Sequence, residues 1–557
     1  MKMKKILLYS IITLFVSSLY GCKEWLDVNT SPNDATTAVM TPALVISSQQ
    51  YDILNNLVNS TYAWQISHHL TKSGEFSGNY TFLNGQIMPQ DLDSWWSTYY
   101  IIAKNLKWIE NKAIEQEDLA YQGIAKTLWV HNFQRMVDIW GDIPYSQACK
   151  PDEYQLPKYD NGEDIYDSLL VKIDEAIACF DQAIGHYSTS ALSKVDIICF
   201  GDLEKWRTVS YTLKLRLLMR ISGVRDVSKE VAAIADKCLP IEETIEANPG
   251  YIAETGKMNK LYETYGWDKN GGRNTNHRQY MPTSILVDLL RDNNDPRLRV
   301  FAQPRVKLGD DPEGFAKYSN SGLENERYVG IPYGQESPAG EDYTCITGTG
   351  LLAGSWNGGF ATSTEAMTRS TTFIAGSEVG FLLAEAALRG MIPGGDAKAK
   401  EYYEAAVIAA MKRHETAMQS PSENFLDYAK NPAVGMKDPI PGTAEEAAKE
   451  YLSQNNSKVN WDLMGSTEAK MEAIGTQKWL SFVGYNPLEA WFEHRRLDYP
   501  VLPCSNQIPE GKNIARLIYP QSERNLNAAN VPADHSLYDT VFWDKENPMV
   551  GITELYL

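Results

Sequence analysis

The sequence predicts a mainly α-helical protein in which pairs of helices pack against a loop-rich region with a few short strands. Apolar residues recur at helical spacing through much of the chain; Phe133, Met136 and Val137, for example, fall on one helical face. The stretch 248–371 breaks this pattern, because it is rich in Gly, Asn, Tyr and Pro. The 43% hydrophobic and 11% aromatic content shows no shift that marks a domain boundary. We therefore expect one large globular unit.

The amino terminus indicates secretion and attachment of lipid. A lysine-rich leader precedes an apolar run over 6–15 that is too short to span a membrane, which predicts a signal peptide over 1–21. Leu19-Tyr20-Gly21-Cys22 looks like a bacterial lipobox, in which a small residue precedes the cleaved bond and the cysteine thiol carries the lipid. We predict Cys22 as the lipidation site, where several acyl chains would anchor the protein firmly. The alternative is an ordinary secreted protein with an incidental cysteine.

The rest of the chain is acidic, and its charge excludes one class of partner. The formal charge is −19, and loss of the three leader lysines makes the mature part −19 − 3, or −22. Such a body repels nucleic acid and anionic membrane surfaces. Residues 22–41 are mostly small, polar or turn-forming, and we expect them to form a tether between the lipid and the globular part.

Amphipathic periodicity and helix-stop residues predict the positions of the long helices. Gly141 and Pro144, for example, end the helix that carries Phe133. The expected helices in the first half cover 42–70, 92–115, 121–139, 162–184 and 203–221. A later pair covers 378–389 and 397–414, separated by a glycine-rich break.

Two of these segments resemble the helix pairs of tetratricopeptide repeats. In 173–183, small alanines alternate with larger apolar residues, so that a neighbouring helix can approach closely. The pair 378–389 and 397–414 repeats this texture, and such pairs stack into solenoid-like scaffolds. Generic helical hairpins are the alternative, because no clean 34-residue period runs through the chain.

Composition divides the expected single domain, 42–557, into four parts. A helical scaffold covers 42–247 and 372–500, and the loop-rich stretch 248–371 between them is the expected ligand region. The segment 501–557 contains several prolines that forbid long helices, and we expect it to wrap over the body.

A series of short motifs runs through nearly the whole mature chain in a fixed order. They are Cys22-Lys23-Glu24-Trp25-Leu26-Asp27, Trp140-Gly141-Asp142, Leu213-Lys214-Leu215-Arg216, Asp295-Pro296-Arg297-Leu298, Leu382-Leu383-Ala384-Glu385-Ala386, Gln477-Lys478-Trp479, Glu489-Ala490-Trp491, Tyr499-Pro500 and Arg516-Leu517-Ile518-Tyr519-Pro520. In this order they resemble the SusD/RagB family of nutrient-binding outer-membrane lipoproteins of Bacteroidetes. The charged residues after Cys22 are also similar to the surface-export signal of such lipoproteins.

The resemblance implies a SusD-like α–α superhelix of tetratricopeptide-like helix pairs, and a binding protein that is not an enzyme. It implies a lipid-anchored protein of the outer membrane that faces the cell exterior. It also implies a partner: members of the family sit as a lid on a TonB-dependent β-barrel transporter (SusC-like) and hand over captured oligosaccharides or oligopeptides. A lid must open and close, so some loops should move.

Most of the motifs have a physical explanation in architecture. Trp140-Gly141-Asp142 suits the end of a helix, because Gly adopts positive φ and Asp satisfies backbone groups. Arg495 and Arg496 lie near Glu493 and Asp498 in sequence, where ion pairs and carbonyl contacts are expected at a helix end. We expect the same structural role for Glu385 and Arg216.

Three loops have the composition of a sugar- or peptide-binding site, namely 73–82, 262–276 and 355–360. Sugar recognition needs an aromatic face against the C–H face of a pyranose and amide, carboxylate or guanidinium groups around it. The candidate ligand-binding residues are Tyr80, Tyr265, Trp267, Arg273, Asn274, Trp356 and Asn357. The alternative for each is an aromatic or polar side chain that packs onto the body. The tryptophans within helices are expected in the core: Trp95, Trp96, Trp108, Trp129 and Trp479.

We predict no catalytic residue, no metal site and no cofactor. The sequence has no CxxC, GxSxG, HExxH or P-loop pattern. His68 and His69 are adjacent on the helix expected over 42–70, so they point about 100° apart, which is poor geometry for chelating one metal. Two other classes of protein stay open. A secreted helical glycoside hydrolase would need two carboxylates across its site, and a tetratricopeptide-type structural adaptor would need a helix-lined groove.

Overall fold

Seven α-helices form in the described residues up to position 240, where apolar residues recur at helical spacing. The computed structural model describes residues 40–58, 60–72, 82–266, 269, 276, 279–302, 330–334, 367–415, 442–505, 508, 511–533 and 535–544. The helices are α2 (Pro42–Val58), α3 (Thr61–Ile66), α4 (Asp93–Glu115), α5 (Leu119–Trp140), α6 (Gly162–Ala183), α7 (Leu203–Ile221) and α8 (Ser228–Ile234). Four of the five long helices predicted there are confirmed to within two residues at each end.

Local side-chain chemistry sets where these helices begin and end. Asp118 accepts a hydrogen bond from the Tyr121 amide (3.1 Å), and Asp202 accepts one from the Lys205 amide (3.0 Å). Gly141 ends α5 with φ 76°, a conformation that favours glycine. Asp142 then accepts from the Gly162 amide at the start of α6 (2.8 Å). The structural interpretation of Trp140-Gly141-Asp142 is therefore confirmed.

The helix predicted over 42–70 is wrong beyond residue 58. Ser60 has extended backbone angles and its hydroxyl accepts from the Ala63 amide, so a new, short helix α3 starts there. His68 has φ 60°, and the chain then enters strand β1 (Leu70–Lys72). His68 and His69 therefore lie in a turn and not on a helix.

Shorter helices and two small sheets follow, and long helices return in the described residues from 376 onward. The further helices are α9 (Lys260–Tyr265), α11 (Ser284–Asp292), α12 (Leu298–Phe301), α16 (Gly376–Leu388), α17 (Gly395–Lys412), α20 (Ala444–Leu452), α21 (Thr467–Ser481), α22 (Pro487–Leu497) and α23 (Gln521–Leu526). Strand β1 pairs antiparallel with β3 (Tyr280–Pro282), and β2 (Thr244–Ala247) pairs antiparallel with β4 (Thr371–Ala375). The structure confirms the mainly α-helical fold class.

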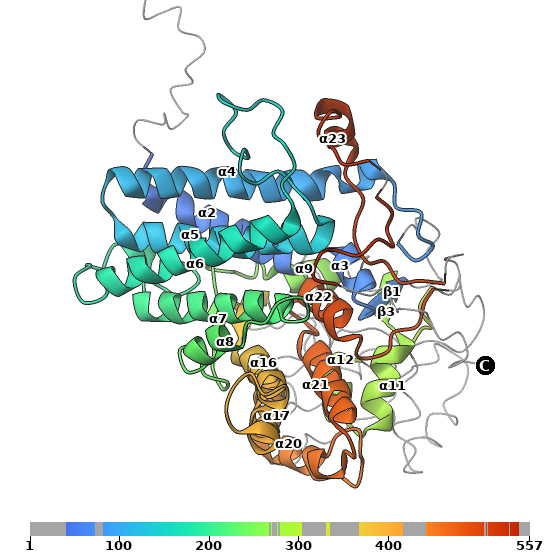
Figure 1. Ribbon diagram of the computed structural model, residues 1–557. Helices are drawn as coiled ribbons and strands as arrows, with labels where there is room; N and C mark the ends of the chain where they lie inside the picture. Colours follow the sequence, from blue (N-terminus) through green and yellow to red (C-terminus); the bar gives the residue numbers. More distant parts are fainter. Residues whose placement is uncertain are drawn as a thin grey trace, which may run out of the picture.

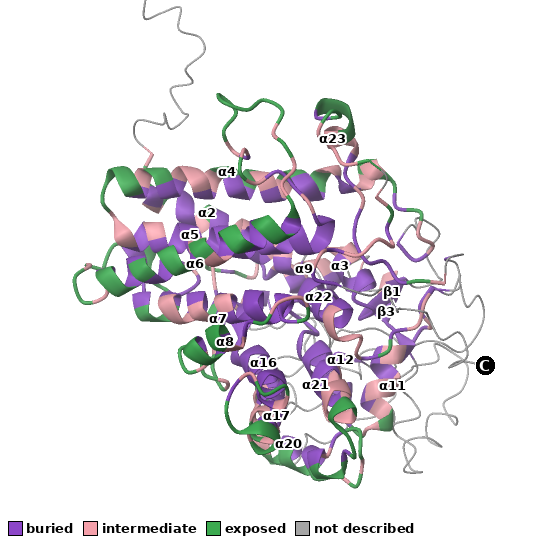
Figure 2. Ribbon diagram, viewed as in Figure 1, coloured by how far each residue is buried: buried purple, intermediate pink, exposed green. Residues whose placement is uncertain are grey.

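The helices are arranged as neighbouring pairs around one core. Helices α4, α5, α6 and α7 lie side by side in sequence order, and α16, α17, α20 and α21 form a second group (Figure 1). The outward faces of α4 and α6 are exposed and their inward faces are buried (Figure 2). Buried apolar side chains from Val45 to Trp543 form one continuous cluster. No helix in the described part of the chain is both long and apolar enough to cross a membrane.

Glycine allows the paired helices to approach closely. A Cβ atom at Gly123 in α5 would lie 2.6 Å from the Phe180 ring of α6. A Cβ atom at Gly380 in α16 would lie 2.7 Å from the Cβ of Ala406 in α17. Both distances are shorter than real side-chain contacts, so these positions require the smallest residue. The small-residue pattern of the predicted helix pairs thus corresponds to close packing.

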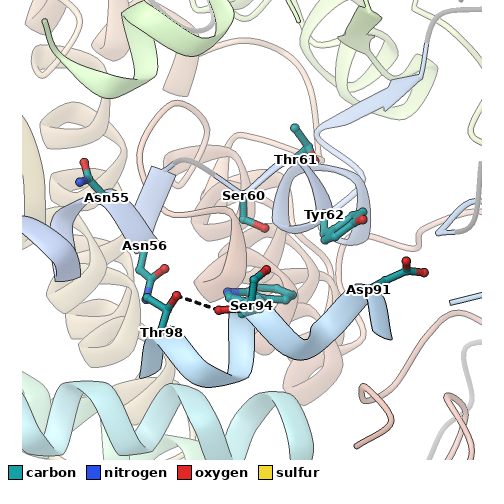
Figure 3. A pocket seen from close by; sticks show the side chains of 9 residues that line it. Asn55, Asn56, Ser60, Thr61, Tyr62, Asp91, Ser94 and Thr98 are labelled. Atoms are coloured by element: carbon teal, nitrogen blue, oxygen red, sulfur yellow. Dashed lines mark hydrogen bonds between the residues drawn. The ribbon is translucent and has the colours of Figure 1, made fainter. Parts of the chain in front are cut away.

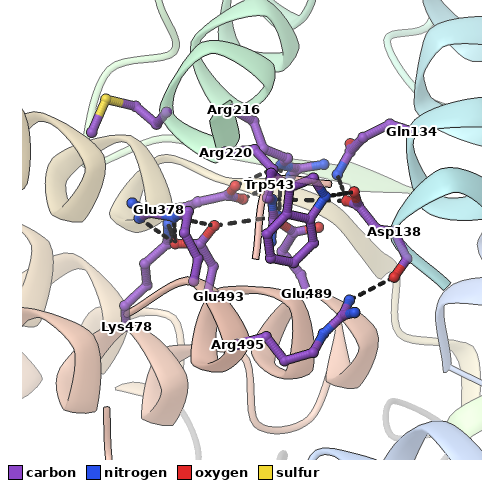
Figure 4. Close-up of polar contacts among 12 residues, drawn as sticks. Gln134, Asp138, Arg216, Arg220, Glu378, Lys478, Glu489, Glu493, Arg495 and Trp543 are labelled. Carbon is purple, nitrogen blue, oxygen red and sulfur yellow. Dashed lines mark hydrogen bonds and ion pairs between the residues drawn. The ribbon is translucent and has the colours of Figure 1, made fainter. Parts of the chain in front are cut away.

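A buried ionic network connects five helices that are far apart in sequence (Figure 4). Arg216 of α7 donates two hydrogen bonds to Glu378 of α16, at 2.6 and 2.7 Å, and both side chains are at most 1% exposed. Arg220, one turn further along α7, pairs with Glu489 of α22 and lies 3.8 Å from Asp138 of α5.

The network continues through α21 and α22. Lys478 pairs with Glu493 at 2.7 Å, and Arg496 pairs with both Glu493 (2.7 Å) and Glu385 (2.5 Å). Burial by itself would raise the pKa of Glu493, but Arg496, Lys478 and Arg220 hold that pKa well below its usual range. The expected structural roles of Glu385, Arg216 and Arg496 are confirmed.

The carboxyl-terminal segment packs against the end of α5. The Leu517 amide donates to the Ile139 carbonyl (2.8 Å), and the Trp543 indole donates to the Asp138 carboxylate (2.8 Å). Arg495 of α22 donates to the carbonyls of Asp138 (2.6 Å) and Ala515, which joins α5, α22 and this segment at one point.

We expect Arg216→Met to lower the free energy of unfolding by about 3–5 kcal/mol, because it leaves the buried Glu378 carboxylate without its partner. Denaturant titration of the mature chain would measure the change. The matched control is Arg207→Met, which removes a surface ion pair to Asp181 (3.0 Å) and should cost less than about 1 kcal/mol. Equal effects of the two variants would contradict the importance of the buried pair.

Candidate ligand site

A pocket of about 280 Å³ opens between α2, α3 and the start of α4 (Figure 3). We call it the α2–α4 pocket. Nine residues line it: Asn55, Asn56, Ser60, Thr61, Tyr62, Asp91, Ser94, Trp95 and Thr98. It exists because the chain breaks after α2 and restarts at Ser60, which sets α3 at an angle to α2 and leaves space against α4. The volume lies just below the range of about 300–1,000 Å³ that is typical of small-molecule pockets.

Aromatic rings form one wall of the pocket. The Tyr62 ring stacks on Phe82 with 4.1 Å between ring centroids, and it tilts against Trp95 at 6.5 Å. Burial raises the pKa of Tyr62, and the nearby Asp91 carboxylate raises it further. The Tyr62 hydroxyl is therefore protonated at neutral pH and can both donate and accept hydrogen bonds.

Among the residues that the structure describes, three buried polar atoms of the pocket residues have no hydrogen-bond partner. They are the amide oxygen Oδ1 of Asn55, the amide nitrogen Nδ2 of Asn56 and the indole Nε1 of Trp95. Each such atom costs about 1–3 kcal/mol when it is buried without a partner. Because these atoms are themselves buried, it is the other atoms of the same residues that line the cavity.

The charge of the pocket comes from a single residue. Asp91 is the one charged side chain among the nine lining residues, and none of the nine is basic. Its carboxylate accepts from the Met88 amide (3.0 Å) and so helps to fix the start of the helical segment. A glycosidase needs two carboxylates across its site, and the lining of this pocket supplies one.

The sequence-predicted ligand residues are mostly outside the described residues. Tyr265 is the exception, and it is 1% exposed: its ring lies 6.3 Å from Trp64 and 6.2 Å from Tyr280, in edge contacts within the core. This position favours a role in packing α9 over direct ligand contact. The predicted residues that lie outside the described part are Cys22, Tyr80, Trp267, Arg273, Asn274, Trp356 and Asn357.

The pocket residues were not among those singled out from the sequence, apart from Trp95. Trp95 and three other helical tryptophans, Trp96, Trp129 and Trp479, are buried as expected, whereas Trp108 is half-buried. The sequence feature that could have indicated the pocket was a run of polar residues that interrupts the apolar pattern, namely Asn55, Asn56, Ser60 and Thr61. A continuous helix over 42–70 would have scattered these side chains over its surface.

The buried histidines are part of the core. His68 stacks on Tyr333 at 3.7 Å, and the His69 ring lies 4.4 Å from Trp479, whose carbonyl is 3.3 Å from His69 Nε2. Burial lowers the pKa of His69 to about 3, and it lowers that of His494 to about 3 as well. No group of three or more potential metal ligands occurs among the residues that the structure describes.

The comparisons with known proteins agree on one family. The protein-family model described as "Starch-binding associating with outer membrane" matches residues 32–520. A SusD homologue from Bacteroides fragilis is 20% identical with a TM-score of 0.68, and the match covers 91% of this chain and 100% of that chain. A SusD/RagB family protein from Bacteroides thetaiotaomicron is 19% identical with a TM-score of 0.67, covering 91% and 99%.

A structure described as a chitin-binding protein is 23% identical with a TM-score of 0.65, and the match covers 91% of this chain and 100% of that chain. At these identities the solved structures establish the fold. No curated protein matches the chain.

The buried histidines predict a loss of stability below pH 6.5. Each is neutral in the folded state, whereas the unfolded chain takes up a proton on each imidazole as the pH falls from 6.5 toward 3. We expect His69 to account for about 2 kcal/mol of the stability lost between pH 6.5 and pH 5.

His69→Gln keeps a donor for the Trp479 carbonyl and should weaken this pH dependence, as measured by denaturant titration at pH 7 and pH 5. The exposed His186→Gln is the matched control. An unchanged pH dependence in His69→Gln would show that this histidine does not cause the loss of stability at low pH.

Proposed function

This chain belongs to the SusD-like family, whose members are described as starch-binding and associated with the outer membrane, and on that premise we propose that it is a surface lipoprotein that captures nutrient oligosaccharides. In this proposal Cys22 carries the lipid, and the mature chain faces the cell exterior. The captured oligosaccharide passes intact to a TonB-dependent β-barrel transporter, over which the protein acts as a lid. The observation that carries the proposal is the family match over 32–520, which includes nearly all of the mature chain.

The α2–α4 pocket supports binding of a sugar. It combines an aromatic wall with amide, indole and hydroxyl groups, which is the combination that pyranose recognition requires. We propose that Tyr80, Trp267, Arg273, Asn274, Trp356 and Asn357 provide further contacts from the loops that contain them. Oligopeptides use similar chemistry and are the alternative ligand.

The proposal states that the protein binds the oligosaccharide without cleaving it. Glu489 and Glu493, two carboxylates that lie close together in the buried network, are at most 2% exposed and are engaged by arginine or lysine. Carboxylates held in this way are unavailable for proton transfer to a sugar. The alternative of a structural adaptor lacks support from the pocket, whose aromatic wall and amide and hydroxyl lining suit a small molecule.

We expect the mature chain to bind maltoheptaose or chitohexaose in calorimetry and to leave the sugar intact, as chromatography of the mixture would show. Trp267→Ala and Trp356→Ala should each weaken binding several-fold, because a ring stacked on a sugar contributes about 1 kcal/mol. Phe200→Ala is the matched control, since this ring is 51% exposed and does not line the α2–α4 pocket. Release of shorter sugars would contradict the proposal. Binding of peptides alone would show that the ligand is a peptide and not a sugar.

Cys22→Ser should move the protein from the membrane fraction to the soluble fraction, because the thiol that carries the lipid is gone. The wild-type protein, extracted in mild detergent, should co-purify with a large β-barrel transporter. Recovery of the wild-type mature chain without lipid in the periplasm would contradict the anchor, and its isolation without any transporter would contradict the lid role.

A further inference from the structure

We infer that an apolar surface beside the start of α2 contacts the lipid bilayer that holds the anchor, and so fixes how the protein lies on the membrane. We call this surface the tether-end patch, and it consists of Leu44, Phe200 and Ile252. The inference rests on the proposed function, because it takes Cys22 as the lipidated residue. It adds a second membrane contact, made by the folded part of the chain.

Two large apolar side chains are exposed on segments that touch each other. Leu44 is 68% exposed on the first turn of α2, and Phe200 is 51% exposed in the connection between α6 and α7. Ser47, three residues after Leu44 and therefore on the same face of α2, donates a hydrogen bond from its hydroxyl to the carbonyl of Val195. Leu44 and Phe200 thus belong to one region of the surface.

Ile252 extends this region on the other side of the same connection. The Asn248 amide donates to the carbonyl of Ile197 (3.1 Å), so the segment that follows β2 lies against the segment that carries Phe200. Ile252 is 42% exposed. Single exposed apolar residues are common on soluble proteins, whereas several on adjoining segments indicate a contact surface.

The backbone at Phe200 holds the ring outward at an energetic cost. Phe200 has φ 54°, a left-handed conformation that is rare for a large side chain. The buried Asp196 carboxylate imposes this turn, since it accepts from the Ile198 amide (3.2 Å), the Gly201 amide (2.8 Å) and the Trp206 indole (2.7 Å). Backbone strain that the surrounding structure maintains is typical of functional positions.

The position of the patch indicates a lipid surface as its partner. The start of α2 and the α6–α7 connection lie at one end of the first helix group, and α23 lies toward the other end (Figure 1). Residues 23–39 join Cys22 to Met40, and even fully extended they reach about 60 Å, at about 3.5 Å per residue. A lipid on Cys22 therefore keeps this end of the protein near the bilayer, at a high local concentration.

The chemistry of the contact is apolar and not electrostatic. The mature chain is strongly acidic, so anionic lipids repel it and attraction between charges cannot hold it on a membrane. Leucine, isoleucine and phenylalanine side chains enter the boundary between headgroups and acyl chains readily. Three such side chains bind weakly by themselves, but the anchor makes a weak contact sufficient.

Flotation of the Cys22→Ser mature chain with vesicles of dioleoylphosphatidylcholine measures the patch without the anchor. We expect reversible association at lipid concentrations on the order of 1 mM, which is too weak to keep this variant in a washed membrane fraction. Leu44→Ser and Phe200→Ser, each added to Cys22→Ser, should lower the partition coefficient about 5- to 10-fold, because each removes one inserted side chain.

Leu526→Ser, also added to Cys22→Ser, is the matched control for Leu44→Ser. Leu526 is 75% exposed on α23, away from the patch, and its replacement should leave the partition coefficient unchanged. Equal partition coefficients for the Leu44→Ser and Leu526→Ser chains, or no flotation of the Cys22→Ser chain at all, would overturn the inference.

Phe200→Gly separates a role in membrane contact from a role in the fold. Glycine adopts positive φ without strain, so this variant should melt at the same temperature as the Cys22→Ser parent or higher, while its partition coefficient falls as in Phe200→Ser. A lower melting temperature with unchanged partition would show that the ring serves the fold alone.

Hydrogen exchange of the lipidated wild-type chain places the contact on the anchored protein. In dioleoylphosphatidylcholine vesicles, peptides that cover 42–50 and 196–203 should exchange several-fold more slowly than in the Cys22→Ser chain in buffer, whereas a peptide that covers α23 should not change. Unchanged exchange in a vesicle-bound chain would overturn the inference and leave the anchor intact. Protection that appears only when a co-purified transporter is present would show that the patch is a protein interface. A wild-type chain without lipid would contradict the proposed anchor, and the flotation result would still decide the inference.

Discussion

The ion pairs between α7, α16, α21 and α22 are the interactions on which the rest of the structure depends. Arg216 with Glu378 joins α7 of the first group to α16 of the second, and Arg220 with Glu489 joins α7 to α22, in each case across more than 150 residues of sequence. Desolvation makes each of these charges expensive unless its partner is in place. The two helix groups therefore have one mutual arrangement in which all the charges are paired, and this specifies how the scaffold closes around its core.

The candidate ligand site benefits from this rigidity. The α2–α4 pocket is formed by α2, α3 and α4, which pack on the same core as the network, and Trp95 in its lining contacts Trp140 at the end of α5. Two residues earlier, Asp138 accepts hydrogen bonds from Trp543, Tyr166 and Gln134. A pocket built on such supports keeps its lining side chains in place before a ligand arrives, which lowers the entropic cost of binding.

Periodicity and capping chemistry were sufficient to predict most of the fold from the sequence. The long helices near 92–115, 162–184 and 203–221 were predicted closely, because their apolar stripes and end signals agree. The break after Val58 was missed, because Ser60 can cap a helix or lie within one and only the tertiary packing decides. The pocket depends on that break. The sequence therefore identified the family and fold but did not point to the pocket residues, and the predicted ligand residues outside the described part of the chain stay predictions.

The long-range pairing of charged side chains is the other feature of the structure that the sequence did not reveal. Arg216 and Glu378 were each expected to be structural, but nothing in their local sequence says that they meet.

The most direct test of the account is the structure of the mature chain with a bound neutral oligosaccharide. We predict an intact sugar in contact with the α2–α4 pocket and an unchanged ionic network. A cleaved sugar, or an intact sugar bound elsewhere with only water in the pocket, would contradict it.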